Sequence, residues 1–117
     1  MREIKFRAWN YQEERFIGHK DLFGTGAYFN DPFSRMDIDL QQYTGLKDKN
    51  GKGIYEGDIV KREEENGVVR WDDLIARFRV YMDSDNPMPR NYPLWSELFE
   101  VIGNIYENPE LINQPEL

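Results

Sequence analysis

The chain has 117 residues, of which 39% are hydrophobic and 15% aromatic, and it contains no cysteine. This length is typical of one domain, and the apolar content excludes a disordered chain. The lack of cysteine excludes disulfide frameworks, thiolate nucleophiles and cysteine-based zinc sites. The N-terminal residues do not resemble a signal peptide, and no apolar run reaches the length of a membrane span, so we expect a cytoplasmic protein.

The net charge of −7 is concentrated in the last third of the chain. Residues 1–40 carry six basic and seven acidic residues, for −1, and residues 41–81 carry eight of each, for 0. Residues 82–117 carry one arginine and seven acidic residues, for −6. No third of the chain has the excess of basic residues that is typical of proteins that bind a nucleic-acid backbone. The acidic end is interpreted as a solvated face, or as a surface for a basic partner.

Alternation of apolar and polar residues predicts a hairpin at the N-terminus. Residues 3–9 form its first strand, with three apolar side chains on one face and lysine and arginine on the other. Residues 15–18 could return as the second strand. The apolar face of the first strand consists of Ile4, Phe6 and Ala8.

The next two segments have different patterns. Residues 22–33 mix glycine, proline and aromatic residues without a regular period, which predicts a long loop that packs through its aromatic rings. Residues 36–41 alternate again and predict a half-buried strand with Met36, Ile38 and Leu40 on its inner face.

The second half of the chain is predicted to be a series of short strands. Residues 54–61 look extended, and residues 68–71 and 76–82 follow the same pattern. Asn66-Gly67 is the favoured pair for a two-residue hairpin turn, so we expect a turn there. Roughly seven strands at regular spacing suggest an all-β barrel or sandwich.

The C-terminal part contains a proline-rich segment and a final strand. Residues 83–93 hold three of the six prolines and predict a loop, after which a helical turn could start at Pro93. Residues 99–106 are predicted to form a strand with a kink or bulge at Gly103.

The glycine-rich stretch at residues 40–61 could be a metal loop, a phosphate cradle or a turn. A calcium loop starting at Asp48 would have Lys52 and Ile59 at two ligand positions, which excludes it. A phosphate loop would require Ser or Thr where Gly53 stands. A turn is therefore predicted, because Asn and Gly supply the positive φ that tight turns require. The predicted turn residues are Gly45, Asn50, Gly51, Gly53 and Gly57.

Candidate catalytic groups are few. Asp37 and Asp39 share one face of a predicted strand and could hold a divalent cation for phosphodiester cleavage, although such acids are ordinarily solvent-facing. A second pair, Asp72 and Asp73, has no histidine nearby, and His19 stands alone in a predicted loop. No nucleophile elbow or zinc-protease motif is present. We therefore expect no enzyme activity, no metal and no cofactor.

Cations and aromatic rings are interleaved at residues 70–71 and 77–79. Such a pattern could serve base stacking or a partner interface. Alternation, however, places Trp71 and Phe78 on the face opposite the arginines, which favours packing in the core.

Four blocks of the sequence, taken together and in order, resemble one family. They are MREIKFRAW, QYTGLKDKNGKGIYEGDIV, VVRW and FEVIGNIYENPEL, and they extend over residues 1–111. This combination resembles the YopX family, small proteins of Bacillus and Staphylococcus phages and prophages. The resemblance implies a mainly β protein with a C-terminal SH3-like β-barrel and an N-terminal β-rich segment used in oligomerisation. It implies no catalytic residue, because the family's biochemical role is unestablished.

The resulting hypothesis has two domains and a binding function. Residues 1–35 would form the self-association segment, and residues 36–117 the barrel with its acidic end. The protein would be a phage or prophage accessory protein that contacts a host or phage protein, with no membrane partner. A nucleic-acid-binding barrel using the basic residues at 47–52, 61–62 and 77–79 is the alternative, and a nuclease using Asp37 and Asp39 is less favoured.

Self-association is expected because an isolated two-stranded hairpin is marginal in water and its apolar face needs a cover. We predict a homo-oligomer, most simply a dimer, whose interface lies within residues 1–35. The interface candidates are Ile4, Phe6, Ala8, Phe16, Ile17, Phe23, Tyr28, Phe29 and Phe33.

Overall fold

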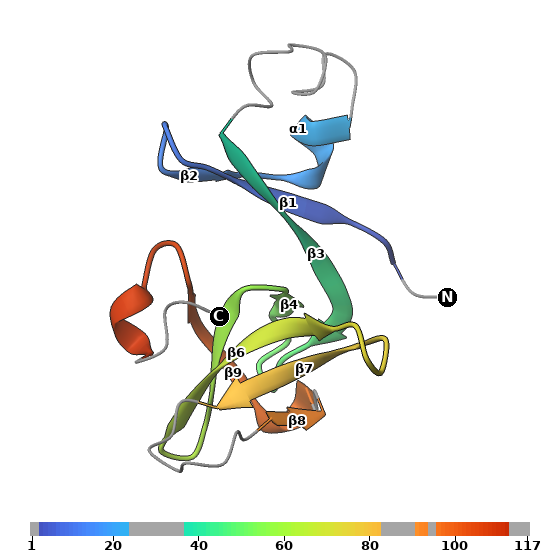
Figure 1. Cartoon of the computed structure of the whole chain (residues 1–117), viewed down its shortest axis with the longest axis vertical. Coiled ribbons are helices and arrows are strands. Elements are labelled where there is room, and N and C mark those ends of the chain that lie inside the picture. Colours follow the sequence, from blue (N-terminus) through green and yellow to red (C-terminus); the bar gives the residue numbers. More distant parts are fainter. Residues whose placement is uncertain (1–2, 24–36, 83–90, 94–95, 113–117) are drawn as a thin grey trace. The chain divides into compact units, whose positions relative to one another are not determined.

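The chain is mainly β, as the sequence predicted, with two antiparallel sheets and little helix (Figure 1). This computed structural model describes residues 3–23, 37–82, 91–93 and 96–112. The chain divides into two compact units, residues 1–43 and 44–117. In the described residues no helix combines the length and apolar character needed to span a bilayer.

The first unit consists of a hairpin, a short helix and part of a long strand. Its elements are β1 (Phe6–Asn10), β2 (Arg15–Ile17), α1 (His19–Phe23) and the start of β3 (Ile38–Lys47). The second unit holds the end of β3 and all later elements. These are β4 (Gly53–Tyr55), β5 (Asp58–Arg62), β6 (Glu65–Asp72), β7 (Arg77–Met82), β8 (Asn91–Pro93), η3 (Ser96–Leu98), β9 (Glu100–Asn104) and η4 (Pro109–Leu111).

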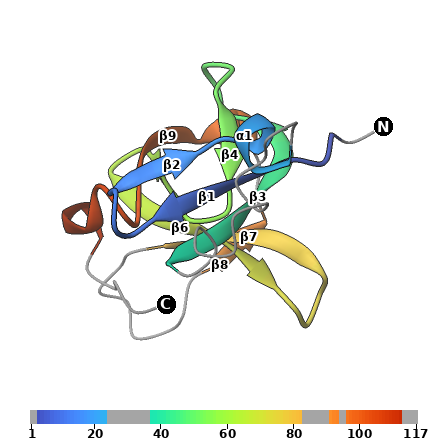
Figure 2. The same ribbon diagram turned by 90° about the horizontal axis from the view of Figure 1, so that it is seen from above.

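In the first unit β1 is the central strand and pairs antiparallel with β2 and with β3. Figure 2 shows β1 and β2 side by side, and the register aligns Ala8 with Ile17. The turn between them is held by Asn10, whose Oδ1 accepts the N–H groups of Gln12 and Glu13. The predicted N-terminal hairpin is confirmed.

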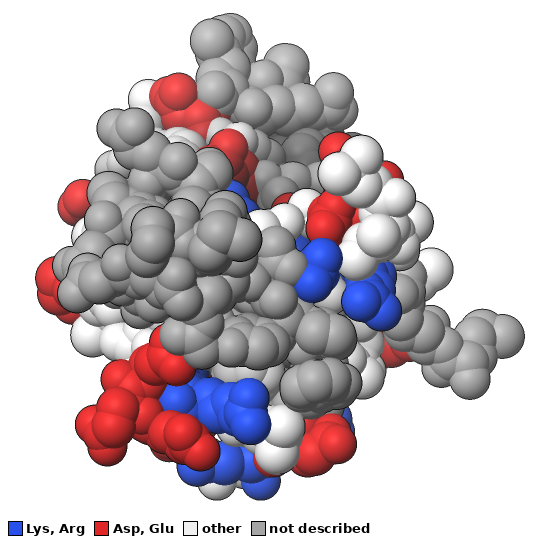
Figure 3. All heavy atoms as spheres, turned by 60° about the horizontal axis from the view of Figure 1, so that its bottom comes forward, with Lys and Arg blue, Asp and Glu red and all other residues white. Residues whose placement is uncertain are grey.

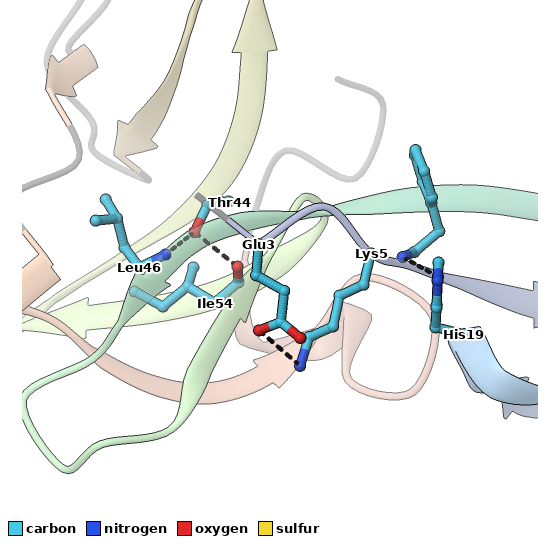
Figure 4. A network of polar contacts seen from close by, with 7 residues as sticks. Glu3, Lys5, His19, Thr44, Leu46 and Ile54 are labelled. Carbon is cyan, nitrogen blue, oxygen red and sulfur yellow. Dashed lines mark hydrogen bonds and ion pairs between the residues drawn. The ribbon is translucent and has the colours of Figure 1, made fainter. Parts of the chain in front are cut away.

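The apolar face of this hairpin is covered by α1. Ala8, Ile17 and Leu22 form a buried cluster, with Phe6 and Ile38 packed against it. The helix is fastened to β1 because the Phe6 N–H donates to Nδ1 of His19 over 3.0 Å (Figure 4). The prediction that His19 and Leu22 lie in loops was therefore wrong. Both belong to α1, and Leu22 packs against the apolar face of the hairpin. The rest of the predicted aromatic loop, residues 24–33, lies outside the described residues.

The long strand β3 differs in two ways from its prediction. Leu40, expected to face inward, is exposed, whereas Gln41 and Tyr43 are buried. Met36 lies outside the described residues. The predicted boundary at 35/36 also differs from the structural division after Tyr43, because residues 38–42 of β3 pair with β1 and so belong to the first unit.

The second unit is built on a five-stranded antiparallel sheet in the order β8-β7-β6-β5-β9, which curls as a half-barrel (Figure 1). Residues 78, 80 and 82 of β7 are buried and alternate with more exposed positions, as predicted. The main core lies on one face of this sheet. It consists of Ile54, Val60, Val69, Phe78, Val80, Met82 and Phe99, with Val101 packed against it.

Two turn predictions in this unit need correction. The two-residue turn between β5 and β6 is Glu63–Glu64, because Arg62 pairs with Glu65. Asn66-Gly67 instead lies within β6. Asn66 donates to the carbonyl oxygen of Leu111, and a Cβ on Gly67 would come within 2.7 Å of Val80 Cγ1. This glycine is present for close packing and not for a turn.

The final strand β9 carries the predicted irregularity. The β5–β9 register shifts between Ile59 and Val60, which leaves Ile102 as an extra residue next to Gly103. A Cβ on Gly103 would meet Oδ1 of Asn108 at 2.5 Å, so the chain requires glycine there. The helical turn predicted to start at Pro93 is displaced, because Pro93 ends β8 and the 3₁₀ turn η3 begins at Ser96.

Candidate functional site

The glycine-rich stretch is organised by one buried carboxylate, Asp48, which is 6% exposed. Its Oδ1 accepts the N–H groups of Asn50 at 2.9 Å and Lys52 at 2.8 Å. Its Oδ2 accepts the N–H group of Val101 at 2.8 Å, 53 residues away in the chain. The side chain therefore closes the turn and fastens it to β9.

These contacts also set the ionisation of Asp48. Burial by itself raises the pKa of this carboxyl, but hydrogen bonds from Val101, Lys52 and Asn50, aided by the Lys52 charge, outweigh it and lower the pKa below its usual 3.8. Both oxygen atoms are occupied by backbone donors. The carboxylate therefore serves as scaffold, and the turn interpretation fits this geometry better than a calcium loop.

The predicted turn glycines are confirmed at three of four positions. Gly45, Gly51 and Gly57 have φ near +87°, a conformation that favours glycine. Gly53 begins β4 without a positive φ. Asn50 lies inside the turn that the Gly51 N–H closes by donating to the Asp48 carbonyl, and it too has no positive φ.

The turn after β4 divides the predicted single strand at residues 54–61. Asp58, which is buried, accepts the N–H of Tyr55 with its Oδ2. The Gly57 N–H donates to the Val69 carbonyl at 2.8 Å. These contacts fix the turn, whose residues are buried or half-buried. At the end of β3, the Thr44 hydroxyl donates to the Ile54 carbonyl and accepts from the Leu46 N–H (Figure 4).

The β6–β7 loop, residues 73–76, exposes apolar side chains. We define the β6–β7 tip as Trp71, Leu74 and Ile75. Leu74 is 95% exposed, Trp71 41% and Ile75 44%. They account for three of the five large apolar residues that are exposed in the described part of the second unit. Such a group of apolar side chains marks a candidate interaction surface.

The backbone of this loop is fixed despite its exposure. Asp72 Oδ1 accepts the Leu74 N–H at 2.9 Å, and Asp72 Oδ2 accepts from Arg79 Nη1 at 3.4 Å. Trp71 packs edge-on against Phe78 with ring centroids 5.0 Å apart. The loop projects beyond its neighbouring strands in Figure 2. The tip therefore presents its side chains on an ordered frame.

Trp71 was predicted to pack in the core, and this was wrong in part. Its partner Phe78 is buried, but Trp71 lies near the end of the ladder, where no further strand covers it in the described residues. Leu74 and Ile75 were not singled out from the sequence. The available signal was an apolar pair directly after Asp72-Asp73, within a segment that otherwise reads as a turn.

The predicted interface residues of the first unit have different surroundings. Ala8 and Ile17 are buried within their own unit, and Phe6 and Phe16 are half-buried. Ile4 is 64% exposed and Phe23 51% exposed, so these two side chains remain accessible. The other three candidates, Tyr28, Phe29 and Phe33, lie outside the described residues.

The two aspartates of the nuclease hypothesis both accept hydrogen bonds from Tyr11. Asp39 accepts a hydrogen bond from the Tyr11 hydroxyl, and the Asp37 carbonyl accepts from the Tyr11 N–H. Across the described ranges, no three His, Asp or Glu side chains are gathered in a way that could hold a metal ion.

Basic and acidic side chains are interspersed on the surface. In Figure 3 the described lysines and arginines adjoin acidic side chains instead of forming one wide basic area. Lys49 pairs with Glu100 and Arg79 with Asp72, which illustrates the same mixing. A large electrostatic footprint for nucleic acid is therefore not supported by this view.

Comparison with known proteins identifies the family. The model of the YopX protein family matches residues 5–113, and the chain belongs to this family. The crystal structure of protein EF1440 from Enterococcus faecalis is similar, with a TM-score of 0.65 and 25% identity over 97% of this chain and 100% of that chain. Among curated proteins none matches the chain.

Proposed function

We propose that this YopX-family protein is a non-enzymatic binding module that contacts a protein partner through the β6–β7 tip. The observation that carries the proposal is the exposure of Trp71, Leu74 and Ile75 at the end of the β6–β7 hairpin, where Asp72 holds the loop backbone. Exposed apolar side chains on an ordered frame lose little conformational entropy when they bind. Aromatic and aliphatic anchors of this kind dominate protein interfaces.

The rest of the proposal concerns architecture and setting. We propose that the second unit is an SH3-like barrel, which its curled five-stranded antiparallel sheet supports. We also propose that the protein acts as a phage or prophage accessory protein in the host cytoplasm, which agrees with its family. The acidic last third would then be an auxiliary surface for a basic region of the partner.

The test is a comparative capture experiment from lysogenic or infected host lysate. The tip variant combines Leu74→Ser with Ile75→Ser, and the control is Leu46→Ser, an exposed leucine outside the tip. We expect the wild type and the control to retain the same protein partner and the tip variant to lose it. Equal retention by all three proteins would refute the tip as the binding surface.

The proposed lack of enzyme activity has its own assay. Because Tyr11 donates to Asp39 and the described residues form no metal cluster, we expect no cleavage of DNA or RNA with magnesium or manganese. Metal-dependent cleavage that disappears in Asp37→Asn would revive the nuclease hypothesis.

A further inference from the structure

Two arginines face each other on the side of the sheet opposite the main core. The β6–β7 register places Arg70 directly opposite Arg79. Val69 and Phe78, next to them in the chain, point into the core on the other face. Like charges directly opposite each other destabilise an antiparallel pair. The register therefore brings two positive side chains to the same face, where Arg79 is paired with Asp72 and Arg70 is attracted by Glu56.

Arg70 is the more unusual of the two. It is half-buried, its Nε is enclosed, and no described residue accepts a hydrogen bond from that atom. Burial lowers the pKa of Arg70, while the charges of Glu56, Tyr106 and Tyr81 oppose this change. A buried guanidinium donor that lacks an acceptor is costly, so an acceptor that reaches Arg70 would stabilise this side chain.

Arg79 supplies a second guanidinium that is already oriented. Its Nη1 donates to Asp72 Oδ2 at 3.4 Å, and both side chains are mostly buried, with 20% and 13% exposed. Asp72 is itself held by the Leu74 N–H. The Arg79 side chain is therefore restrained on the same face of the sheet as Arg70, which reduces the entropy lost when an anion binds.

We propose that Arg70 and Arg79 together bind a phosphate group on this face of the sheet. Guanidinium groups bind phosphate through paired N–H···O bonds. Two such groups suit an anion with more than two oxygen atoms, and a single carboxylate offers only two. The phosphate could belong to a free small molecule or to a nucleic-acid backbone. A net charge of −7 favours one phosphate group over a long polyanion.

The test is an NMR titration of the full chain with inorganic phosphate at constant ionic strength. We expect saturable chemical-shift changes centred on the amides of β6 and β7, and much weaker changes with acetate. Non-saturating shifts, or equal responses to phosphate and acetate, would overturn the proposal. This comparison uses the wild-type protein and so does not depend on whether a variant folds.

Four variants assign the binding to these side chains. Arg70→Gln should weaken phosphate binding by about tenfold or more, and Arg70→Lys should weaken it too, because lysine keeps the charge but lacks the planar fork. Glu56→Gln should strengthen binding, because it removes a carboxylate that attracts Arg70 and repels the anion. Lys61→Gln, which removes an exposed charge from β5, should change little. Equal affinity in Arg70→Gln and the wild type would refute the site.

A short single-stranded oligonucleotide distinguishes the two sources of phosphate. Tighter binding than inorganic phosphate, lost in Arg70→Gln, would support the site and identify a nucleic-acid backbone as its source. Arg70-dependent binding of inorganic phosphate without oligonucleotide binding would support a small phosphorylated ligand. Oligonucleotide binding that is unchanged in Arg70→Gln, with no saturable phosphate binding, would contradict the proposal.

Discussion

Asp48 shows how one side chain can join distant parts of a small protein. Its carboxylate accepts three backbone hydrogen bonds, two within its own turn and one from Val101 on β9. Hydrogen bonds to a charged group contribute more than neutral ones, and a buried carboxylate such as Asp48 is costly without them. We therefore regard Asp48 as a residue that controls stability instead of binding a ligand.

Replacing Asp48 with alanine should lower the free energy of unfolding by roughly 3 kcal/mol, because three backbone N–H groups lose a charged acceptor. The pKa of Asp48 is lowered in the folded state, so its stabilisation is present above the usual 3.8 and is lost as the pH falls through the lower folded value. The stability difference between wild type and Asp48→Ala should accordingly shrink in acid.

Chemical denaturation at neutral pH and below pH 3.8 would measure this difference. Asp73→Ala, at an exposed aspartate in the β6–β7 loop, is the matched control and should have little effect. A difference between wild type and Asp48→Ala that does not change with pH would show that the carboxylate charge is unimportant.

A comparison of Gly51 with Gly18 tests the effect of backbone conformation alone, because an added side chain would be uncrowded at both positions. Neither would bring an added Cβ within 4 Å of another described group, but only Gly51 has a positive φ, +86°. Gly51→Ala should destabilise the protein by about 1 kcal/mol, with a similar or larger cost for Gly51→Val, whereas Gly18→Ala should be close to neutral. Thermal denaturation of these variants would decide it, and equal costs at the two positions would contradict the role of φ. Calcium should not change the melting temperature.

Elements in this protein are connected by short turns whose conformation does not always match the residue present. Glu63, in the two-residue turn between β5 and β6, has φ +57°, a conformation that is costly for glutamate. Asn66-Gly67, the pair best suited to such a turn, lies a few residues later inside β6. The hairpin register is therefore decided by strand packing and not by turn propensity.

Glu63→Gly should stabilise the protein by about 0.5–1 kcal/mol, because glycine adopts positive φ without steric cost. Glu64→Gly should destabilise it by a similar amount, since Glu64 has no positive φ and glycine only adds entropy to the unfolded chain. Melting temperatures of the two variants give the comparison. If the two substitutions destabilised the protein equally, the positive φ of Glu63 would be contradicted.

For the whole molecule, we predict self-association through the first unit. Ala8 and Ile17 are buried by α1, so the accessible apolar candidates in the described residues are Ile4 and Phe23. Burying an isoleucine contributes about 1.5–3 kcal/mol, so Ile4→Lys should weaken a dimer by about tenfold or more. Leu74→Ser, in the second unit, should leave it unchanged.

Light scattering and sedimentation over a range of concentrations would measure this association. A wild-type chain that stays monomeric at micromolar concentration would contradict it. Dimerisation that is lost in Leu74→Ser but kept in Ile4→Lys would show that the dimer interface is the β6–β7 tip and not the first unit.

Local patterns in the sequence were sufficient to predict several elements. Alternating residues predicted β1, β2 and β7, because a half-buried strand must place every second side chain in the core. Glycines at 45, 51 and 57 predicted positive φ, and Gly103 predicted the bulge in β9. In each case the cause lies in the residue and its nearest neighbours, which the sequence contains.

Tertiary contacts decided the rest. Position 67 within β6 requires glycine because Val80 and Met82 leave no room for a Cβ. The Asp48 carboxylate accepts a hydrogen bond from Val101, 53 positions away in the chain. The pairing of Arg70 with Arg79 likewise depends on the β6–β7 register. A single sequence could not predict these features, because each depends on which distant backbone and side-chain atoms the folded chain brings together.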